Sequence, residues 1–209
     1  MSHPAIDRLR GLYAVTPDWQ DTARLTRAVA AAVAGGAALV QYRNKTASAD
    51  LRREQALALR AVCRQAAVPL IINDDLDLAV QIDADGVHLG RDDGDCAPVR
   101  SRIGPDRLLG ISCYGDLARV REARAAGAEI VGIGAVFASA TKPHAPPVLH
   151  DVLAKARECG VRVAAIGGIT LANAPGLIAS GADLLAVVSD LFDNPDITSR
   201  AAAYAALFA

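Results

Sequence analysis

LLGISCYGDLARVREARAAGAEIVGIGAVF, residues 108–137, is the stretch that indicates the fold. Two short apolar runs, 108–113 and 130–137, enclose a segment rich in alanine and arginine that suits a helix. We expect this helix to end at Gly127, a usual carboxyl-terminal stop, and the chain to pass directly into the next strand. The stretch therefore predicts one strand–helix–strand unit.

The same alternation continues along the chain. Eight apolar runs are predicted to be strands, at residues 11–17, 38–45, 69–74, 86–90, 108–113, 130–137, 161–168 and 184–190. Between them, residues 48–66 carry an apolar face with the pattern of a helix, whereas 76–82 and 95–103 are short and give a weaker helical signal. The strand runs are nearly continuous in apolar residues, which is typical of strands covered by helices on their outer face.

Strict alternation of strands and helices favours parallel strands joined by helical crossovers. Eight such units predict a (β/α)8 TIM barrel, and we expect one compact domain over residues 1–209 with its core at about 11–207. A doubly wound open sheet is the main alternative. Its dinucleotide-binding form is disfavoured because YAVTPDWQD, not a GxGxxG motif, follows the first run.

Charge and composition exclude several classes of protein. The net charge is −1, from 22 basic and 23 acidic residues without a basic stripe, so neither a nucleic acid nor a membrane surface is an expected partner. The amino terminus, MSHPAIDRLR, lacks the apolar stretch of a signal peptide, and no apolar run approaches the ~18 residues of a membrane span. The four cysteines are scattered without CxxC spacing, which indicates reduced thiols and a cytoplasmic protein.

In a TIM barrel, catalytic and binding residues lie at the carboxyl ends of the strands. The polar residues and glycines at those ends are Thr16, Asp18, Gln41, Arg43, Lys45, Asn73, Asp74, Asp75, His88, Arg91, Asp92, Asp93, Ser112, Ser139, Thr141, Lys142, Gly167, Gly168, Ser189 and Asp190. One rim is thus predicted to hold cations, hydroxyls, carboxylates and a pair of glycines.

Two segments of this rim suit an anion. Gln41, Arg43 and Lys45 alternate along a strand, so they share one side, where a guanidinium beside an ammonium suits a phosphate or pyrophosphate. Residues 139–142, Ser-Ala-Thr-Lys, place short donors and a cation between small residues that let a ligand approach. A solvated strand end and a solvated loop are the alternatives.

Acidic residues follow the third and fourth strands, in NDD (73–75) and RDD (91–93). Neighbouring carboxylates repel one another unless a cation intervenes, and oxygen ligands suit Mg²⁺. The alternative is helix capping, open to both Asp75 and Asp93. Asp74 is the better ligand candidate after the third strand, and Asp93 stands as a candidate after the fourth.

IGGIT, residues 166–170, has the form of the phosphate cup that barrels build after their seventh and eighth strands. Gly167 and Gly168 would let a phosphate reach backbone N–H groups, with Val188 and Ser189 completing the cup; a tight turn needing positive φ at one glycine is the alternative. His88, flanked by apolar residues, favours a packed, hydrogen-bonded imidazole over a catalytic base. No nucleophile elbow GxSxG appears in the sequence, so covalent catalysis is not indicated.

The motifs QYRNK, INDDLDLAVQIDADGVHLGRDD, LLGIS, GIGAVFASATK, AIGGIT and GADLLAVVSD, taken in series, resemble the thiamine-phosphate synthase family. The resemblance covers roughly residues 11–192. It implies a transferase of thiamine biosynthesis that joins 4-amino-2-methyl-5-hydroxymethylpyrimidine diphosphate to thiazole phosphate, with Mg²⁺, and releases pyrophosphate. In this family the pyrophosphate leaves first, and the thiazole nitrogen attacks the resulting carbocation.

The resemblance also implies a role for each matching residue. For the pyrimidine diphosphate these are Gln41, Arg43, Lys45, Asn73, Ser112 and Lys142, of which Arg43, Lys45, Ser112 and Lys142 are the expected catalytic residues. For the thiazole phosphate they are Ser139, Ala140, Thr141, Gly168, Val188 and Ser189, and for Mg²⁺ they are Asp74 and Asp93. The implied partners are these small molecules, and a homo-oligomer is compatible with the sequence.

The chain departs from the family pattern at four places. Ala138 replaces the proline of the usual P-T-x-T-K, Asp75 and Arg91 replace an arginine and a glutamine, and Cys113-Tyr114 stands where a histidine commonly follows the serine. The rival functions are the related thiazole tautomerase, a barrel enzyme for another sugar or indole phosphate, and a protein that binds thiamine precursors without turnover. The complete diphosphate and metal set favours the synthase over all three.

Overall fold

Eight parallel strands close into a barrel in the computed structural model, which describes residues 9–90, 96–137 and 151–209. The strands are β1 (Gly11–Val15), β2 (Leu39–Tyr42), β3 (Leu70–Asn73), β4 (Gly86–Leu89), β5 (Leu108–Tyr114), β6 (Ile130–Ile133), β7 (Arg162–Ile166) and β8 (Leu184–Val187). They are hydrogen-bonded in chain order, and β8 returns to pair with β1, with Gly11 opposite Leu184. The predicted TIM barrel is confirmed, and the open sheet is excluded.

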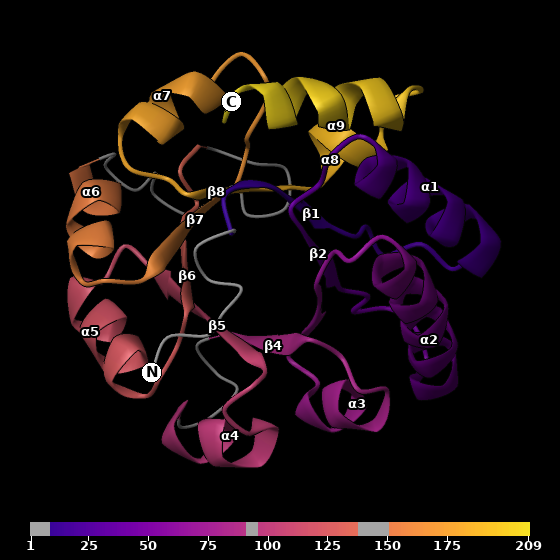
Figure 1. Cartoon of the computed structure of the whole chain (residues 1–209), viewed down its shortest axis with the longest axis horizontal. Coiled ribbons are helices and arrows are strands. Elements are labelled where there is room, and N and C mark those ends of the chain that lie inside the picture. The colour runs from indigo at the N-terminus through magenta and orange to yellow at the C-terminus, as the bar shows by residue number, and fades with distance from the viewer. Residues whose placement is uncertain (1–8, 91–95, 138–150) are drawn as a thin grey trace.

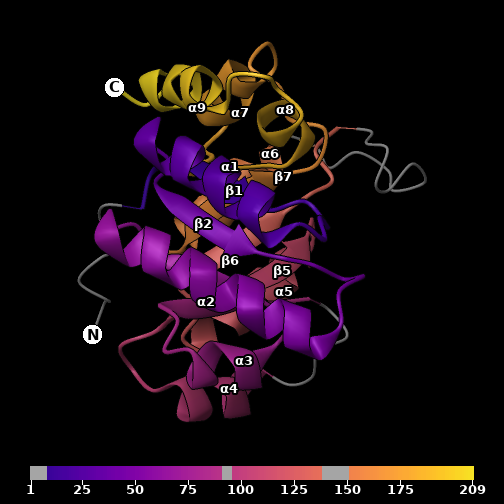
Figure 2. The same ribbon diagram turned by 90° about the vertical axis from the view of Figure 1, so that its right-hand side faces the viewer.

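Helices surround the barrel (Figure 1). They are α1 (Thr22–Ala34), α2 (Ala49–Gln65), α3 (Leu76–Gln81), α4 (Cys96–Ile103), α5 (Leu117–Ala125), α6 (Asp151–Glu158), α7 (Ala174–Ala179), α8 (Ser189–Phe192) and α9 (Ile197–Ala206). Figure 2 shows α1 and α2 side by side on the outside of the strands. The helix expected between the fifth and sixth strands ends as predicted, with Gly127 at a φ of 85° just beyond α5.

Two apolar layers follow from the alternation of side chains along each strand. One layer packs the strands against the helices, and the other fills the barrel with Tyr13, Leu39, Ile71, Leu108, Ile130, Leu184 and their neighbours. Side chains two residues apart on a strand face the same side. The residue two positions after an interior apolar residue therefore also faces the barrel interior, closer to the carboxyl end of the strand. Gln41 thus follows Leu39, and Asn73 follows Ile71, so the barrel core itself positions the polar rim.

The amino-terminal end of the barrel repeats one arrangement three times. Asp85, Glu129 and Asp183 each precede an even-numbered strand, and their carboxylates accept the backbone N–H of Leu70, Leu109 and Val163 at 2.8, 2.8 and 3.1 Å. The backbone N–H of each acid donates to a carbonyl at the start of the same neighbouring strand. An arginine faces each carboxylate, the closest contact being 2.7 Å between Arg100 and Glu129. This end of the barrel is held together by satisfied charges.

Among the described helices, none combines the length and the apolar character that a membrane crossing would require.

Candidate active site

The loop after β2 is fixed to the end of β1 by hydrogen bonds. Thr16, fully buried, accepts the backbone N–H of Arg43 and donates its hydroxyl to the Arg43 carbonyl. Asp18 accepts the Arg43 guanidinium at 3.1 Å and the backbone N–H of Lys45 at 2.7 Å. This arrangement orients both predicted cations, and it holds one nitrogen of the guanidinium in an ion pair with Asp18.

A buried polar network supports the same loop from below. Gln55 of α2 accepts from the Tyr42 hydroxyl at 2.9 Å and from the Asn44 amide at 3.1 Å, and it donates to the Trp19 carbonyl. The Asn44 side-chain oxygen accepts the backbone N–H of Thr46. Because buried polar groups must find partners, this closed network gives the loop one conformation.

Gln41 lies deeper in the barrel, 4% exposed, and its Nε2 donates to the Tyr13 hydroxyl at 2.6 Å. Burial raises the pKa of the Tyr13 phenol well above its usual range, so the ring stays neutral. The contact fixes which end of the Gln41 amide faces Tyr13.

Asp74 and Asp75, in the turn after β3, have different contacts. Asp75 caps α3, since its Oδ1 accepts the Leu78 N–H at 2.9 Å. Asp74 has a left-handed backbone with a φ of 60°, and its N–H donates to the His88 carbonyl at 2.8 Å. Its carboxylate is 31% exposed and meets the Lys45 ammonium at 3.4 Å. The capping alternative thus applies to Asp75, and Asp74 remains open to a ligand.

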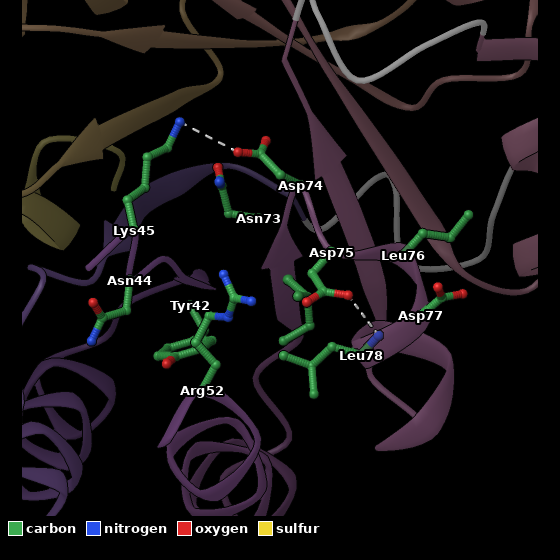
Figure 3. Close-up of a pocket in the computed structure, with 11 residues that line it drawn as sticks. Tyr42, Asn44, Lys45, Arg52, Asn73, Asp74, Asp75, Leu76, Asp77 and Leu78 are labelled. Carbon is green, nitrogen blue, oxygen red and sulfur yellow. Dashed lines mark hydrogen bonds and ion pairs between the residues drawn. The ribbon is translucent and has the colours of Figure 1, made fainter. Parts of the chain in front are cut away.

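A cavity of about 530 Å³ lies between the loops after β2 and β3, and Lys45, Asn73 and Asp74 line it (Figure 3). Arg52 of α2 also lines it, beside Tyr42. The Nε of Arg52 is buried and has no hydrogen-bond partner among the described residues. The first turn of α2 therefore adds a cation, Arg52, that is not among the residues predicted for the site.

His88 and Ser112 meet inside the barrel. Nε2 of His88 lies 3.0 Å from the Ser112 hydroxyl, and His88 as a whole residue is 7% exposed. This confirms the interpretation of His88 as a packed, hydrogen-bonded residue. Arg119 of α5 donates to the carbonyls of Ser112 and Gly90, at 2.8 and 3.1 Å, and so ties together the ends of β5 and β4.

The glycine pair after β7 has the backbone of a tight turn that only glycine adopts easily, with φ of 103° at Gly167 and 63° at Gly168. Asn173 supports this turn, since its amide donates to the Gly168 carbonyl at 3.0 Å and its oxygen accepts the Thr170 N–H. The structure thus shows the turn alternative, which leaves the phosphate cup a prediction.

The end of β8 lies beside this turn on the same rim. Val188 packs at the edge of the interior core, and the exposed Ser189 begins α8. Asp190 is held by the Tyr204 hydroxyl at 2.6 Å and by Arg200 at 3.6 Å. This contact anchors the short α8 to α9.

The predicted residues thus form two groups. Gln41, Arg43, Lys45, Asn73, Asp74 and Ser112 lie at the ends of β2, β3 and β5, and Gly168, Val188 and Ser189 lie at the ends of β7 and β8. Asp93, Ser139, Ala140, Thr141 and Lys142 lie outside the described residues. Sequence reasoning had listed Asp18 only as a rim residue and missed the support from Arg119, which sits seven residues beyond Ser112 on the next helix.

A closed eight-stranded barrel with cations, a carboxylate and a glycine turn at its carboxyl-terminal rim defines the class: a TIM barrel with a polar site where TIM-barrel enzymes have theirs. The family model described as thiamine monophosphate synthase matches residues 12–191. The chain belongs to this family, which confirms the resemblance drawn from the sequence, and with it a transferase of thiamine biosynthesis.

Individual relatives agree over the whole chain. A thiamine-phosphate synthase from Methylobacillus flagellatus is 50% identical over 208 residues, covering 100% of each chain. Another from Aromatoleum aromaticum is 54% identical over 202 residues, covering 96% of this chain and 97% of the relative. The solved structure of thiamine phosphate pyrophosphorylase from Pyrococcus furiosus superposes with a TM-score of 0.84 at 30% identity, over 96% of each chain.

Proposed function

We propose that this chain condenses the aminopyrimidine diphosphate with thiazole phosphate to give thiamine phosphate and pyrophosphate. The family match over residues 12–191 supports this reaction class. The observation that carries the assignment to this rim is the cavity in which Lys45, Asn73 and Asp74 converge. An ammonium suits a diphosphate, a carboxylate suits its Mg²⁺, and an amide can donate to a phosphate oxygen.

The cationic side of the rim binds the diphosphate in this proposal. Lys45, 59% exposed, is free to exchange its contact with Asp74 for a phosphate oxygen, since an exposed ion pair of this kind is weak. Arg43, held by Asp18, presents its remaining N–H groups with its direction already fixed. Asn73, Ser112 and, outside the described residues, Lys142 complete this side.

The residues fit Mg²⁺, on the evidence of the donor set. Asp75 is committed to its helix cap, whereas the Asp74 carboxylate faces the cavity with one exposed lysine as its partner. Mg²⁺ is usually held by one or two carboxylates together with substrate phosphates and water. Asp74 and Asp93 would hold it, and when bound it would neutralise negative charge on the departing pyrophosphate.

The chemistry needs positioning and charge stabilisation more than it needs a strong base. The bond between the pyrimidine methylene carbon and the diphosphate oxygen breaks, and its electron pair leaves with pyrophosphate. The electron-rich aminopyrimidine stabilises the carbocation, and the lone pair of the thiazole nitrogen then forms the new carbon–nitrogen bond. Lys45 and Arg43 stabilise the charge that develops on the leaving group.

The thiazole phosphate occupies the opposite side of the rim in this proposal. The turn at Gly168 brings backbone close to the ligand without a side chain in between, and Ser189 presents a hydroxyl at the start of α8. Val188 borders both the interior core and the rim, where it would contact the thiazole ring. Residues 139–141, outside the described part of the chain, would supply the remaining hydroxyls.

The test is pyrophosphate release from the pyrimidine diphosphate, with and without thiazole phosphate, in Mg²⁺ and then in EDTA. We expect release that depends on the metal and is coupled to formation of thiamine phosphate. Saturable binding of thiazole phosphate without release would overturn the proposal. An assay for thiazole isomerisation would then separate a tautomerase from a protein that only binds.

A further inference from the structure

We infer that His88 is a positioning residue, which holds Ser112 with its side chain and Asp74 with its backbone. The inference rests on the proposed function, because it assigns to His88 the alignment of two groups that act on the same diphosphate. It adds a role for a residue that the sequence pattern had left as a packed imidazole.

The side-chain contact is direct. Nε2 of His88 lies 3.0 Å from the Ser112 hydroxyl oxygen, and one group donates to the other according to the imidazole tautomer. A serine hydroxyl otherwise rotates among three staggered positions. Because His88 as a whole residue is 7% exposed and set in a strand, it restricts Ser112 to the rotamer that it contacts.

The backbone of His88 also contacts Asp74, the candidate metal ligand. The His88 carbonyl accepts the N–H of Asp74 at 2.8 Å. Asp74 has a φ of 60°, a conformation that non-glycine residues rarely adopt without support. His88 also lies directly opposite Asn73 in the β3–β4 ladder. One residue of β4 therefore connects the ends of β3 and β5.

The barrel makes space for this imidazole by omitting two side chains. A Cβ added at Gly110, the register partner of His88, would lie 2.4 Å from the imidazole Nδ1. A Cβ added at Gly132 would lie 3.4 Å from the ring, an ordinary contact distance. Both glycines lack the positive φ that would by itself explain them. The ring thus lies across β5 only because residue 110 has no side chain.

The main test is a double-mutant cycle on turnover in Mg²⁺. We expect His88→Leu to lower kcat by about 10- to 100-fold with a smaller change in KM, and His88→Gln, which keeps a polar group near the Nε2 position, to recover part of the loss. In a Ser112→Ala background, His88→Leu should have no further effect, because it acts through the missing hydroxyl. Losses that multiply in the double variant would overturn the inference.

Gly110→Ala and Gly132→Ala form a matched pair that leaves the imidazole itself intact. The added methyl at residue 110 should displace the ring and reproduce the His88→Leu loss, whereas the methyl at residue 132 should cost little. Equal rates in the two variants would contradict the geometry. Thermal unfolding midpoints identify any variant that has lost its fold.

A spectroscopic arm covers the case in which His88→Leu fails to fold. The chain has four histidines, so imidazole ¹⁵N resonances can be assigned by single substitutions. Ser112→Ala should shift the His88 Nε2 resonance and leave the other three unchanged; an unmoved resonance would overturn the contact. A wild-type chain that binds but does not turn over would refute the proposed function, and the positioning role in catalysis with it. If the wild type is active and the rate losses of His88→Leu and Ser112→Ala multiply in the double variant, only the positioning role is refuted.

Discussion

At the amino-terminal end of the barrel, Asp85, Glu129 and Asp183 each accept a strand N–H and face an arginine, whereas at the carboxyl-terminal end Asp74 faces one exposed lysine across 3.4 Å. Both ends use carboxylates and cations. The difference lies in how completely each carboxylate is satisfied within the protein. At the amino-terminal end every such carboxylate has backbone and side-chain partners, while Asp74 keeps acceptor capacity for something else.

The backbone shows the same contrast. Asp183 continues directly into β8, with its side chain 2% exposed. Asp74 sits in a left-handed turn with its carboxylate 31% exposed. Removing one partner from a satisfied, buried charge network destabilises the fold, whereas a partly satisfied carboxylate in a strained turn is available to a ligand. The two ends should therefore respond differently to the loss of a charge.

The largest expected effect is on catalysis at the carboxyl-terminal end. Lys45→Ala should lower kcat/KM by about 10²- to 10³-fold, the usual cost of removing one group that stabilises developing negative charge. The unfolding midpoint should not change, because the ammonium is 59% exposed and its ion pair contributes little to folding. Pyrophosphate release and thermal unfolding measure the two quantities. The same result is expected for Asp93→Ala.

Lys155→Ala is the matched control for Lys45→Ala. Lys155 is similarly exposed, 55%, and also pairs with an aspartate, but it lies on α6 and does not line the cavity. Its rate should equal that of the wild type. Near-normal turnover in Lys45→Ala would refute the assignment of the diphosphate to this side of the rim.

The next effect is on stability at the amino-terminal end. Asp183→Asn removes the charge that Arg157 and Arg162 face and disturbs the bond to the Val163 N–H, so we expect a loss of about 2–3 kcal/mol in the free energy of unfolding. In a chain of this size that corresponds to about 4–12 °C in the unfolding midpoint. The rate per folded molecule should be unchanged, as measured below the new midpoint.

Asp151→Asn provides the comparison for that loss. Its carboxylate is 56% exposed and pairs with Lys155 on the helix surface, so its midpoint should not move measurably. If Asp183→Asn were as stable as Asp151→Asn, the repeated arrangement at the amino-terminal end would not hold the barrel together.

The fold was accessible from the sequence because strand and helix signals alternate without interruption. Even the weak helical segments 76–82 and 95–103 form α3 and α4. The repeated acids were missed, although Ala84-Asp85, Ala128-Glu129 and Ala182-Asp183 stand before the fourth, sixth and eighth strands. Their role depends on the pairing register between strands, which no single strand reveals.

The site was only partly accessible, for a related reason. Strand ends placed Gln41 and Asn73 on the rim, and the helix-cap argument favoured Asp74 over Asp75 as the ligand. The pairing of Arg43 with Asp18, the contact of His88 with Ser112 and the cavity-lining position of Arg52 each join elements far apart in the sequence. Propensity and periodicity act over one element and do not report such contacts.

The next prediction concerns how the stability of the fold changes with pH. Three buried phenols, Tyr13, Tyr42 and Tyr204, hydrogen-bond to Gln41, Gln55 and Asp190, which belong to or support the carboxyl-terminal rim. Burial raises the pKa of each phenol above the ordinary value of 10.0. Their contribution to stability is therefore complete below pH 10 and is lost as the pH rises toward the raised values. The arginines at the amino-terminal end stay charged throughout this range.

Unfolding midpoints and phenolate absorbance between pH 8 and 11 provide the measurement for this third prediction. The midpoint should be flat up to about pH 9.5 and fall above pH 10, and these three phenols should ionise only as the chain unfolds. Ionisation of all three near pH 10 with the fold intact would contradict the prediction.

The smallest expected effect is at α5, at the carboxyl-terminal end of the barrel. It tests whether the stability of this helix can change without moving Ser112. Asp116 caps α5 by accepting the N–H groups of Ala118 and Arg119, so Asp116→Ala should cost about 1 kcal/mol of unfolding free energy, and Asp116→Asn almost nothing. Arg119 on the same helix is independently held by the carbonyls of Ser112 and Gly90. Turnover should therefore survive in both variants; a loss of rate in Asp116→Ala that Asp116→Asn restores would mean that the helix cap, and not Arg119 alone, sets the position of Ser112.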